Sequence, residues 1–329
     1  HPTRDDPHWQ PIDFRRTFAD VKLPAHLVTG WYDMFLRYQL EDYQLLKANG
    51  LQPYLTVGAS RHVSLSNFGM VTQEGLAWFA AYLKNDPSQL RQQPVRILVM
   101  GSNEWRDLND WPPPAQEAHY FLQGRRRLAI DQPADVSLPD RYVYDPGNPT
   151  PAYGGPLLSF NAGPQDQRAL ESRSDVLTYT TDPLSEDLEV IGTPRVTLYV
   201  RSNLAHTDFV ARLCEVHPDG RSINLCDGLV RLTPGQGEAQ PDGSLKIAIE
   251  LWPTANCFRR GHRVRLQVCS GAYPRLSRNL GLGEPLATAT QWQGTEQLIY
   301  HDAAHPSVLI LPITSWWRDT ADIEMLQYS

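Results

Sequence analysis

The chain has 329 residues, of which 41% are hydrophobic and 20% are charged, and its formal net charge is −7. This acidic balance argues against a nucleic-acid-binding protein, because such binding rests on a basic surface. No apolar run approaches the roughly 18 residues that a membrane span requires, so we expect no membrane partner. The length suits two domains, and 27 prolines favour a turn-rich protein over a helical bundle.

The first 89 residues show the pattern of an α/β domain. Short apolar runs at residues 24–30 and 53–58 predict two buried strands, and residues 35–49 and 71–84 have the apolar spacing of helices. Alternation of strand and helix at this spacing predicts parallel strands. We expect the second helix to carry an apolar side made of Leu76, Phe79, Ala80 and Leu83.

From about residue 90 the pattern changes to short strands separated by turns. Apolar and polar residues alternate at 195–200, 245–251 and 263–268, which is typical of strands with one face in a core. Turn residues such as Pro218-Asp-Gly220 recur between them, and no long helix is evident. The expected fold class is therefore α/β plus all-β, with a sandwich or jelly roll in the second part.

The four cysteines give little support for a zinc site, because none of them forms a close pair. Each lies in a strand-like run, so we predict buried thiols that behave as small hydrophobic groups. A disulfide between two of them, on neighbouring strands, stays open as an alternative. The residues in question are Cys214, Cys226, Cys257 and Cys269, of which Cys214 and Cys226 would form the disulfide.

Two polar side chains follow the two predicted parallel strands, Asp33 after the first and His62 after the second. Catalytic groups of open α/β sheets gather at the carboxyl ends of the strands, and the triad of an α/β-hydrolase follows the order nucleophile, acid, histidine. Asp33 would orient the imidazole, and His62 would take the proton of a nucleophile. The structural alternative is that Asp33 caps the following helix and His62 is a loop residue.

The chain offers no nucleophile in the expected place. Residues 1–32 contain neither Ser nor Cys, and the first serine, Ser60, lies between the acid and the histidine. No Gly-x-Ser-x-Gly sequence occurs, since Gly58-Ala-Ser-Arg-His62 ends in His. We therefore expect this chain alone to be inactive as a serine hydrolase.

Motifs along almost the whole chain resemble one family. They are Asp5–Trp9, Gly30–Phe35, Glu74–Phe79, Tyr82–Lys84, Pro94–Gly101, Trp111–Pro113, Tyr144–Pro146, Thr207–Leu213, Val216–Gly220, Gly261–Arg263 and His305–Ser307. These stretches are similar to the C-terminal part of the CocE/NonD hydrolases, serine hydrolases that include cocaine esterase, α-amino-acid ester hydrolases and X-Pro dipeptidyl-peptidases.

The resemblance implies a fold and two site residues. It implies that residues 1–89 are the C-terminal part of an α/β-hydrolase domain and that residues 90–329 are a jelly-roll β-sandwich domain. It makes Asp33 the triad acid and His62 the triad base. The sequence departs from the family around the histidine, because Gly58-Ala-Ser-Arg-His62-Val63 lacks the Pro, the Trp and the trailing Gly of Gly-Pro-Trp-x-His-Gly.

The function that this resemblance implies is hydrolysis of small-molecule acyl esters or peptide-type amides through an acyl-enzyme, without metal or organic cofactor. The expected partner is the missing N-terminal hydrolase segment with its serine, in the same gene or on a companion chain. Trp31 and Tyr32, beside Asp33, either line the acyl pocket or are core aromatics.

Three further points stay open from the sequence. A non-catalytic binding or scaffold protein that retains the jelly roll is the alternative function. Homo-oligomerisation is open, and a partial α/β layer is expected to aggregate or associate through its exposed sheet edge. The absence of a visible signal peptide leads us to expect a cytoplasmic location.

Overall fold

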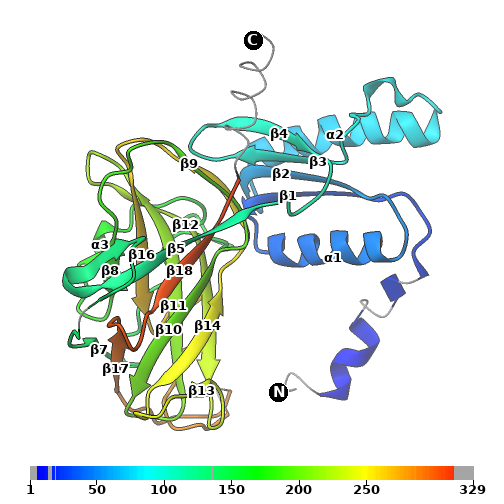
Figure 1. The fold of residues 1–329 in the computed structure, drawn as a ribbon. Helices are drawn as coiled ribbons and strands as arrows, with labels where there is room; N and C mark the ends of the chain where they lie inside the picture. The colour runs from blue at the N-terminus through cyan, green and yellow to red at the C-terminus, as the bar shows by residue number, and fades with distance from the viewer. Residues whose placement is uncertain (1–5, 14–16, 19, 135, 286, 315–329) are drawn as a thin grey trace, which may run out of the picture. The chain divides into compact units, whose positions relative to one another are not determined.

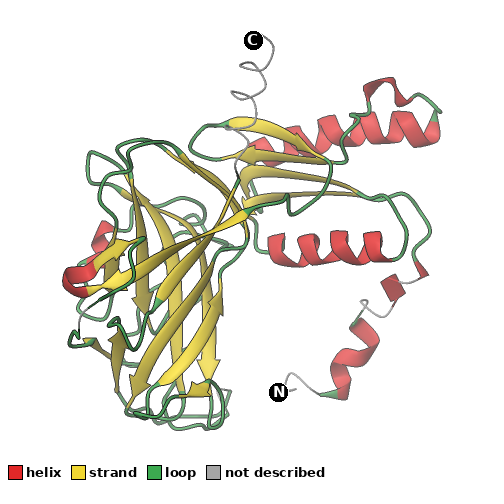
Figure 2. Cartoon of the chain, in the orientation of Figure 1, coloured by secondary structure: helices red, strands yellow, loops and turns green. Residues whose placement is uncertain are grey.

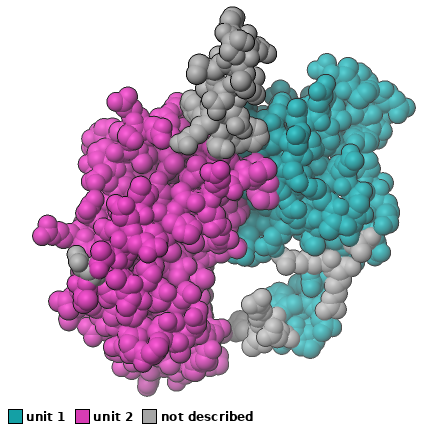
Figure 3. Space-filling model, in the orientation of Figure 1, with its two compact units in different colours: residues 1–98, 104–111 teal, residues 99–103, 112–329 magenta. Residues whose placement is uncertain are grey.

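Figure 1 shows the computed structural model of the chain, which describes residues 6–13, 17–18, 20–134, 136–285 and 287–314. Asp5, the first residue of the motif at 5–9, lies outside these ranges. The chain divides into two compact units (Figure 3): unit 1 is His1–Leu98 with Glu104–Trp111, and unit 2 is Val99–Asn103 with Pro112–Ser329. The long helices belong to unit 1, and unit 2 consists mostly of strands (Figure 2).

Unit 1 is built on a four-stranded sheet in the order β1-β2-β3-β4. Its elements are η1 (Pro7–Ile12), β1 (His26–Tyr32), α1 (Leu36–Ala48), β2 (Tyr54–Arg61), α2 (Leu65–Leu83), η3 (Pro87–Gln89), β3 (Val95–Val99) and β4 (Glu104–Leu108). Strand β2 pairs in parallel with both β1 and β3. Helices α1 and α2 lie on opposite faces of this sheet (Figure 1). The prediction of parallel strands is confirmed.

Helix α1 packs one narrow stripe of side chains under the sheet. Its buried residues are Leu36, Leu40, Tyr43 and Leu46, and their spacing of three or four residues places them on one face of the helix. Beyond Asn49, the backbone N–H of Gly50 donates to the carbonyl of Lys47, and Gly50 takes the left-handed conformation that ends many helices. The predicted stop is therefore where the helix ends.

Helix α2 begins earlier than the predicted residue 71. The Ser64 hydroxyl accepts a hydrogen bond from the Asn67 backbone N–H at 3.2 Å, which starts the helix there. The expected apolar side is uncovered, since Leu76, Phe79 and Leu83 are 69%, 59% and 75% exposed. Within the described residues, this helix therefore presents a large apolar face to solvent.

The sheet of unit 1 continues past residue 89, where we expected the α/β part to end. Val95 of β3 lies beside Leu55 of β2 in a parallel ladder, and β4 follows β3 in the same sheet. These backbone pairings hold residues 95–98 and 104–108 in unit 1. The division into compact units thus falls later along the chain than residue 89, and the boundary between residues 89 and 90 stays a prediction.

His26, at the start of β1, is a buried neutral imidazole. Its Nε2 lies 3.0 Å from the Thr56 hydroxyl, and its ring packs against Tyr54 and Trp78. Burial, with a smaller contribution from the charge of Arg91, lowers the pKa of His26 from 6.5 to about 3. Although a Glu74 carboxylate oxygen lies 3.7 Å from His26 Nε2, burial dominates, and the folded state favours the uncharged form of this side chain.

This lowered pKa predicts acid sensitivity. The unfolded chain binds a proton at His26 below about pH 6.5 while the folded chain does not, so the free energy of unfolding falls as pH decreases, by about 1.4 kcal/mol per unit. Between about pH 7.5 and about pH 5, we expect the free energy of unfolding of the parent chain to fall by about 2 kcal/mol because of His26. The variant His26→Gln should lack this loss. The control His119→Gln, at a half-exposed position, should show it as the parent chain does. Urea unfolding at both pH values checks this; equal losses in both variants would contradict it.

Unit 2 is one connected network of strands. Its elements are β5 (Gln116–Gln123), η4 (Gly124–Arg126), β6 (Arg127–Ala129), β7 (Asp140–Tyr144), α3 (Arg168–Glu171), β8 (Leu177–Thr180), β9 (Leu188–Gly192), β10 (Arg195–Ser202), β11 (Thr207–Val216), β12 (Ser222–Leu232), β13 (Glu238–Ala239), β14 (Leu245–Glu250), β15 (Thr254–Phe258), β16 (Arg263–Cys269), β17 (Thr295–Tyr300) and β18 (Val308–Ile313). The main path runs β12-β11-β16-β8-β6-β5-β18-β10-β14-β13. Along this path every pair of neighbouring strands is antiparallel except β6 with β8, which is parallel.

One hydrophobic core fills unit 2, and the predicted alternation supplies it. The buried core members of the three alternating stretches are Val196, Leu198, Val200, Ile247, Ile249, Leu251, Val264, Leu266 and Val268. Strand β11 departs from alternation because all its residues are buried, on both faces. The prediction of half-buried strands is confirmed for β10 and β14. In β16 the alternation holds only as far as Leu266, because Gln267, expected on the polar face, is buried as well.

All four cysteines are free and buried, as predicted. Cys226 lies opposite Leu213, and Cys214 lies opposite Asn224, across a register shift, so these two cysteines are not direct cross-strand partners. Burial raises the pKa of Cys257 and of Cys269 to about 11, which leaves both thiols protonated and unreactive.

Unit 2 also buries a charged group among its strands. Arg212 on β11 is 3% exposed and contacts side chains from three other segments: Asp227 on β12 at 3.5 Å, and the Oε1 atoms of Gln267 at 3.0 Å and Gln167 at 3.2 Å. Asp227 also accepts from Arg275 at 2.7 Å. Burial acts to raise the pKa of Asp227, but the two guanidinium groups outweigh it and leave that pKa lowered.

No helix in the described part of the chain combines the length and the apolar character that crossing a membrane requires.

Candidate active site

The candidate site lies where β1 and β2 end side by side. The parallel register places Gly30 beside Gly58 and, after a local irregularity, Tyr32 beside Arg61. Asp33 and His62 are the next residues of the two strands. Because parallel strands end at the same edge of a sheet, their side chains leave the sheet at neighbouring positions.

The structure brings the two side chains into contact. His62 Nδ1 lies 3.2 Å from each carboxylate oxygen of Asp33. The Asp33 side chain is 4% exposed and that of His62 is 37% exposed, so the carboxylate is shielded while part of the imidazole reaches solvent. With Nδ1 facing the acid, Nε2 is the ring nitrogen that remains for a third group, the arrangement of a catalytic acid–histidine pair.

Asp33 does not cap α1, because the residue at the start of this helix is Phe35 and it has no side-chain cap, but Asp33 does hold the turn before the helix. Its Oδ1 accepts a hydrogen bond from the Phe35 backbone N–H at 2.9 Å, just before α1. One carboxylate therefore contacts both the turn before α1 and the imidazole. The two contacts are compatible, since a carboxylate has lone pairs for both partners.

Two residues that the sequence did not single out hold His62 in place. The Phe35 ring meets the imidazole edge to face, with ring centroids 5.1 Å apart. The Asn67 side-chain amide donates to the His62 carbonyl at 3.3 Å. Phe35 stands two residues after Asp33 and could have been suspected from that spacing, whereas the role of Asn67 depends on where α2 begins.

Ser60 is not placed as a nucleophile for His62. It is 6% exposed, and its Oγ lies 3.4 Å from the Asn67 side-chain oxygen. A Cβ atom added to Gly30 would come within 2.2 Å of the Ser60 carbonyl oxygen, so the two strands approach each other closely here. The glycine is needed for this close approach, which fixes the spacing of the strand ends that carry Asp33 and His62.

Gly30→Ala is therefore expected to damage both stability and the Asp33–His62 geometry. A backbone clash of this size forces the strands apart, and we expect a loss of at least about 2 kcal/mol in the free energy of unfolding. The matched control is Gly75→Ala in α2, where an added Cβ meets nothing within 4 Å, and which should stabilise the helix by about 0.5–1 kcal/mol. Urea unfolding of both variants checks this, and a harmless Gly30→Ala would contradict the close approach.

Trp31 and Tyr32 are core residues in the structure. Each is only 2% exposed. The Trp31 indole N–H donates to the Leu98 carbonyl at 2.7 Å, and its ring packs against Trp111 with centroids 5.6 Å apart. These contacts leave no surface for a substrate, so the structure favours the core interpretation over the acyl-pocket interpretation.

Comparison with known proteins places the chain in a family. The family model described as the X-Pro dipeptidyl-peptidase C-terminal non-catalytic domain matches residues 90–310. The cocaine esterase of Rhodococcus sp. (strain MB1 Bresler) is 35% identical over 346 aligned positions, which cover 95% of this chain and 60% of the esterase. The chain belongs to the CocE/NonD hydrolase family. It corresponds to the C-terminal portion of these hydrolases.

Solved structures support the same fold. An aminopeptidase from the marine sediment archaeon Thaumarchaeota archaeon matches with a TM-score of 0.82 over 94% of this chain and 58% of its own length. An α-amino acid ester hydrolase matches with a TM-score of 0.80 over 94% of this chain and 59% of its own length. Both are 24% identical to this chain, so the likeness concerns the fold. The chain thus spans about three-fifths of the CocE/NonD relatives it matches.

Proposed function

We propose that this chain is the C-terminal part of a serine hydrolase of acyl esters or peptide-type amides. The observation that carries the proposal is the contact between His62 and Asp33, with a shielded carboxylate and a partly exposed imidazole at the ends of two parallel strands. The names of two relatives, cocaine esterase and α-amino acid ester hydrolase, support an ester substrate.

In the proposed mechanism, His62 Nε2 takes the proton of a serine hydroxyl as the serine oxygen attacks the carbonyl carbon of the substrate. Backbone N–H groups of the complete enzyme stabilise the oxyanion. His62 then returns the proton to the leaving alcohol or amine, and the acyl-enzyme forms. Water, deprotonated by His62, releases the acid and restores the serine. Asp33 stabilises the imidazolium in both steps, and no metal or organic cofactor is used.

The proposed source of the serine is the N-terminal hydrolase segment that the relatives have beyond the matched part. Two features of unit 1 support such a partner. Among the described residues, strand β1 pairs only with β2 and so leaves an edge open to further strands. The exposed apolar side chains of α2, which include Leu76, Phe79 and Leu83, form a face that a hydrolase core would cover. Without that cover, we expect the chain to associate with itself.

We also propose that unit 2 is the jelly roll of the family. Its antiparallel ladders around one core support this assignment, as does the match of the family model to residues 90–310.

A direct test compares the 1–329 chain alone with the same chain joined to the nucleophile-bearing segment of a CocE/NonD hydrolase. The chain alone should neither hydrolyse 4-nitrophenyl acetate nor react with a fluorophosphonate probe, whereas the joined protein should do both. Labelling of the chain alone would place a nucleophile inside it and overturn the division that we propose.

A non-catalytic scaffold is the second candidate function. It is favoured by one observation, the description of the domain matching residues 90–310 as non-catalytic. The same experiment separates the two candidates, since a joined protein that unfolds cooperatively but hydrolyses neither esters nor X-Pro amides would favour the scaffold.

A further inference from the structure

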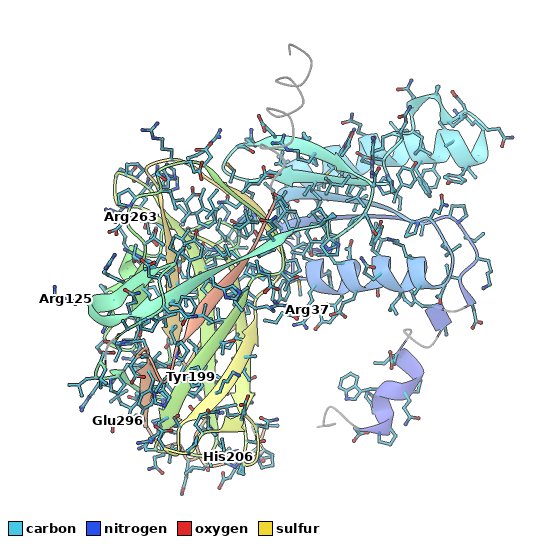
Figure 4. The ribbon with its side chains drawn as sticks, viewed as in Figure 1. Arg37, Arg125, Tyr199, His206, Arg263 and Glu296 are labelled. Atoms are coloured by element: carbon cyan, nitrogen blue, oxygen red, sulfur yellow. The ribbon has the colours of Figure 1, made fainter. Side chains whose placement is uncertain are left out.

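Three side chains that can ligate a metal lie together in unit 2, which the proposed reaction does not use. Glu215 is in β11, His217 follows that strand, and His262 precedes β16. One ligand atom from each lies within 4.8 Å of the others. Arg263, labelled in Figure 4, is the residue after His262 and marks the place.

The strand register explains why these residues meet. Strands β11 and β16 are antiparallel, and their outermost pair is Val216 with Arg263. The next position outward on each strand is His217 and His262, which therefore face each other at the end of the ladder. Glu215 is two residues before His217, so its side chain leaves the sheet on the same face. The ring centroids of the two histidines are 4.5 Å apart.

Turns on both sides fix the two histidines. The His217 N–H donates to the Arg221 carbonyl at 2.8 Å, and the His217 carbonyl accepts from the Gly220 N–H at 2.9 Å, which closes the β11–β12 hairpin. The His262 N–H donates to the Arg259 carbonyl, and the His262 carbonyl accepts from the Leu184 N–H. The backbone of both residues is thus held independently of any ligand.

The Glu215 carboxylate is buried, and a second side chain orients it. Glu215 is 5% exposed, and its Oε2 accepts from the Asn256 amide at 3.3 Å. Its Oε1 lies 2.7 Å from His262 Nδ1. Nearby arginines are directed elsewhere, since Arg259 pairs with Asp187 and Arg263 donates to the Thr181 carbonyl. Among the described residues, Glu215 forms its salt bridge with His262 and with no guanidinium group.

We propose that Glu215, His217 and His262 form a zinc site. Two imidazole nitrogens and one carboxylate oxygen are a donor set that zinc accepts, with a fourth position left for water. The ion replaces the proton shared by Glu215 and His262, and these two ligand atoms separate from 2.7 Å to roughly 3.3 Å, as bonds of about 2.0–2.1 Å in a tetrahedron require. Asn256 acts as the group that orients the carboxylate. The bound ion ties the β11–β12 hairpin to the turn before β16.

The test is calorimetric titration of ZnCl₂ into the chelator-treated chain. We expect one ion per chain, with binding abolished by His217→Ala and by Glu215→Gln, and weakened about 10–100-fold by Asn256→Ala. The matched control is His119→Ala, because His119 lies 3.6 Å from Glu117 in a half-exposed pair. This variant should bind zinc as the parent chain does.

Thermal unfolding with and without ZnCl₂ provides a second readout. Zinc should raise Tm of the parent chain and of His119→Ala, since an ion that binds the folded state stabilises it, and should leave Tm of Glu215→Gln unchanged. Absence of zinc binding by the parent chain overturns the proposal, and so does undiminished binding by His217→Ala. If Glu215→Gln fails to fold, His217→Ala decides, because its side chain is only partly buried.

Discussion

Replacing His62 with alanine in the joined hydrolase is expected to lower kcat by about 10⁴-fold or more. The imidazole is the group that accepts the proton of the serine, and loss of one triad member removes most of the catalysis that the triad supplies. Asp33→Asn should cost about as much, because the amide favours the wrong tautomer of His62. Steady-state hydrolysis of 4-nitrophenyl acetate measures both effects.

The control for this experiment is His119→Ala, which removes a half-exposed imidazole that the mechanism does not use and should leave kcat within about twofold. Asp33 also accepts from the Phe35 N–H, so its role in folding has to be separated from its role in catalysis. Asp33→Asn retains an oxygen at that position, and its urea midpoint should stay near that of the parent. A His62→Ala protein with nearly full kcat would refute the assignment of the base.

The sequence predicts the α/β layer well where local signals decide. Apolar runs define β1 and β2, and the Asn49-Gly50 pair stops α1. The sequence predicts the structure poorly where the burial of a surface depends on what packs against it. The apolar side of α2 has the spacing of a core face, yet Leu76 and Phe79 are exposed because the described part of the chain contains nothing that covers them. The extent of unit 1 likewise depends on pairing between β2 and β3, which periodicity does not specify.

The candidate site divides in the same way. The positions of Asp33 and His62, directly after consecutive parallel strands, are visible in the sequence, and the family resemblance implies the roles that we propose for them. Whether Trp31 faces a pocket or the core is not visible, because the outcome depends on Leu98 and Trp111, far along the chain.

The cluster of Glu215, His217 and His262 was not found from the sequence for the same reason. Its ligands come together only through the register of β11 with β16. The one local signal was a Glu and a His two residues apart at a strand end, and by itself that signal indicates only a shared face.

The buried charge of Arg212 makes a second large effect expected, on stability. Arg212→Met should lower the free energy of unfolding by about 3–5 kcal/mol, measured by urea denaturation, because breaking a buried charged network leaves partners without compensation. The Oε1 atoms of Gln167 and Gln267 lose their donor, and Asp227 keeps Arg275 but loses its second cation.

The matched variant is Arg168→Met, which removes the ion pair between Arg168 and Asp166. The Arg168 side chain is 57% exposed, so this variant should leave the free energy of unfolding nearly unchanged. If both variants lowered the free energy of unfolding equally, the buried contacts of Arg212 would contribute no more to stability than a surface ion pair does. The expected difference has a structural cause, since Arg212 joins side chains of β11, β12 and β16 and of the segment before α3. Its removal should therefore loosen three neighbouring strands at once, whereas loss of the surface pair affects one turn.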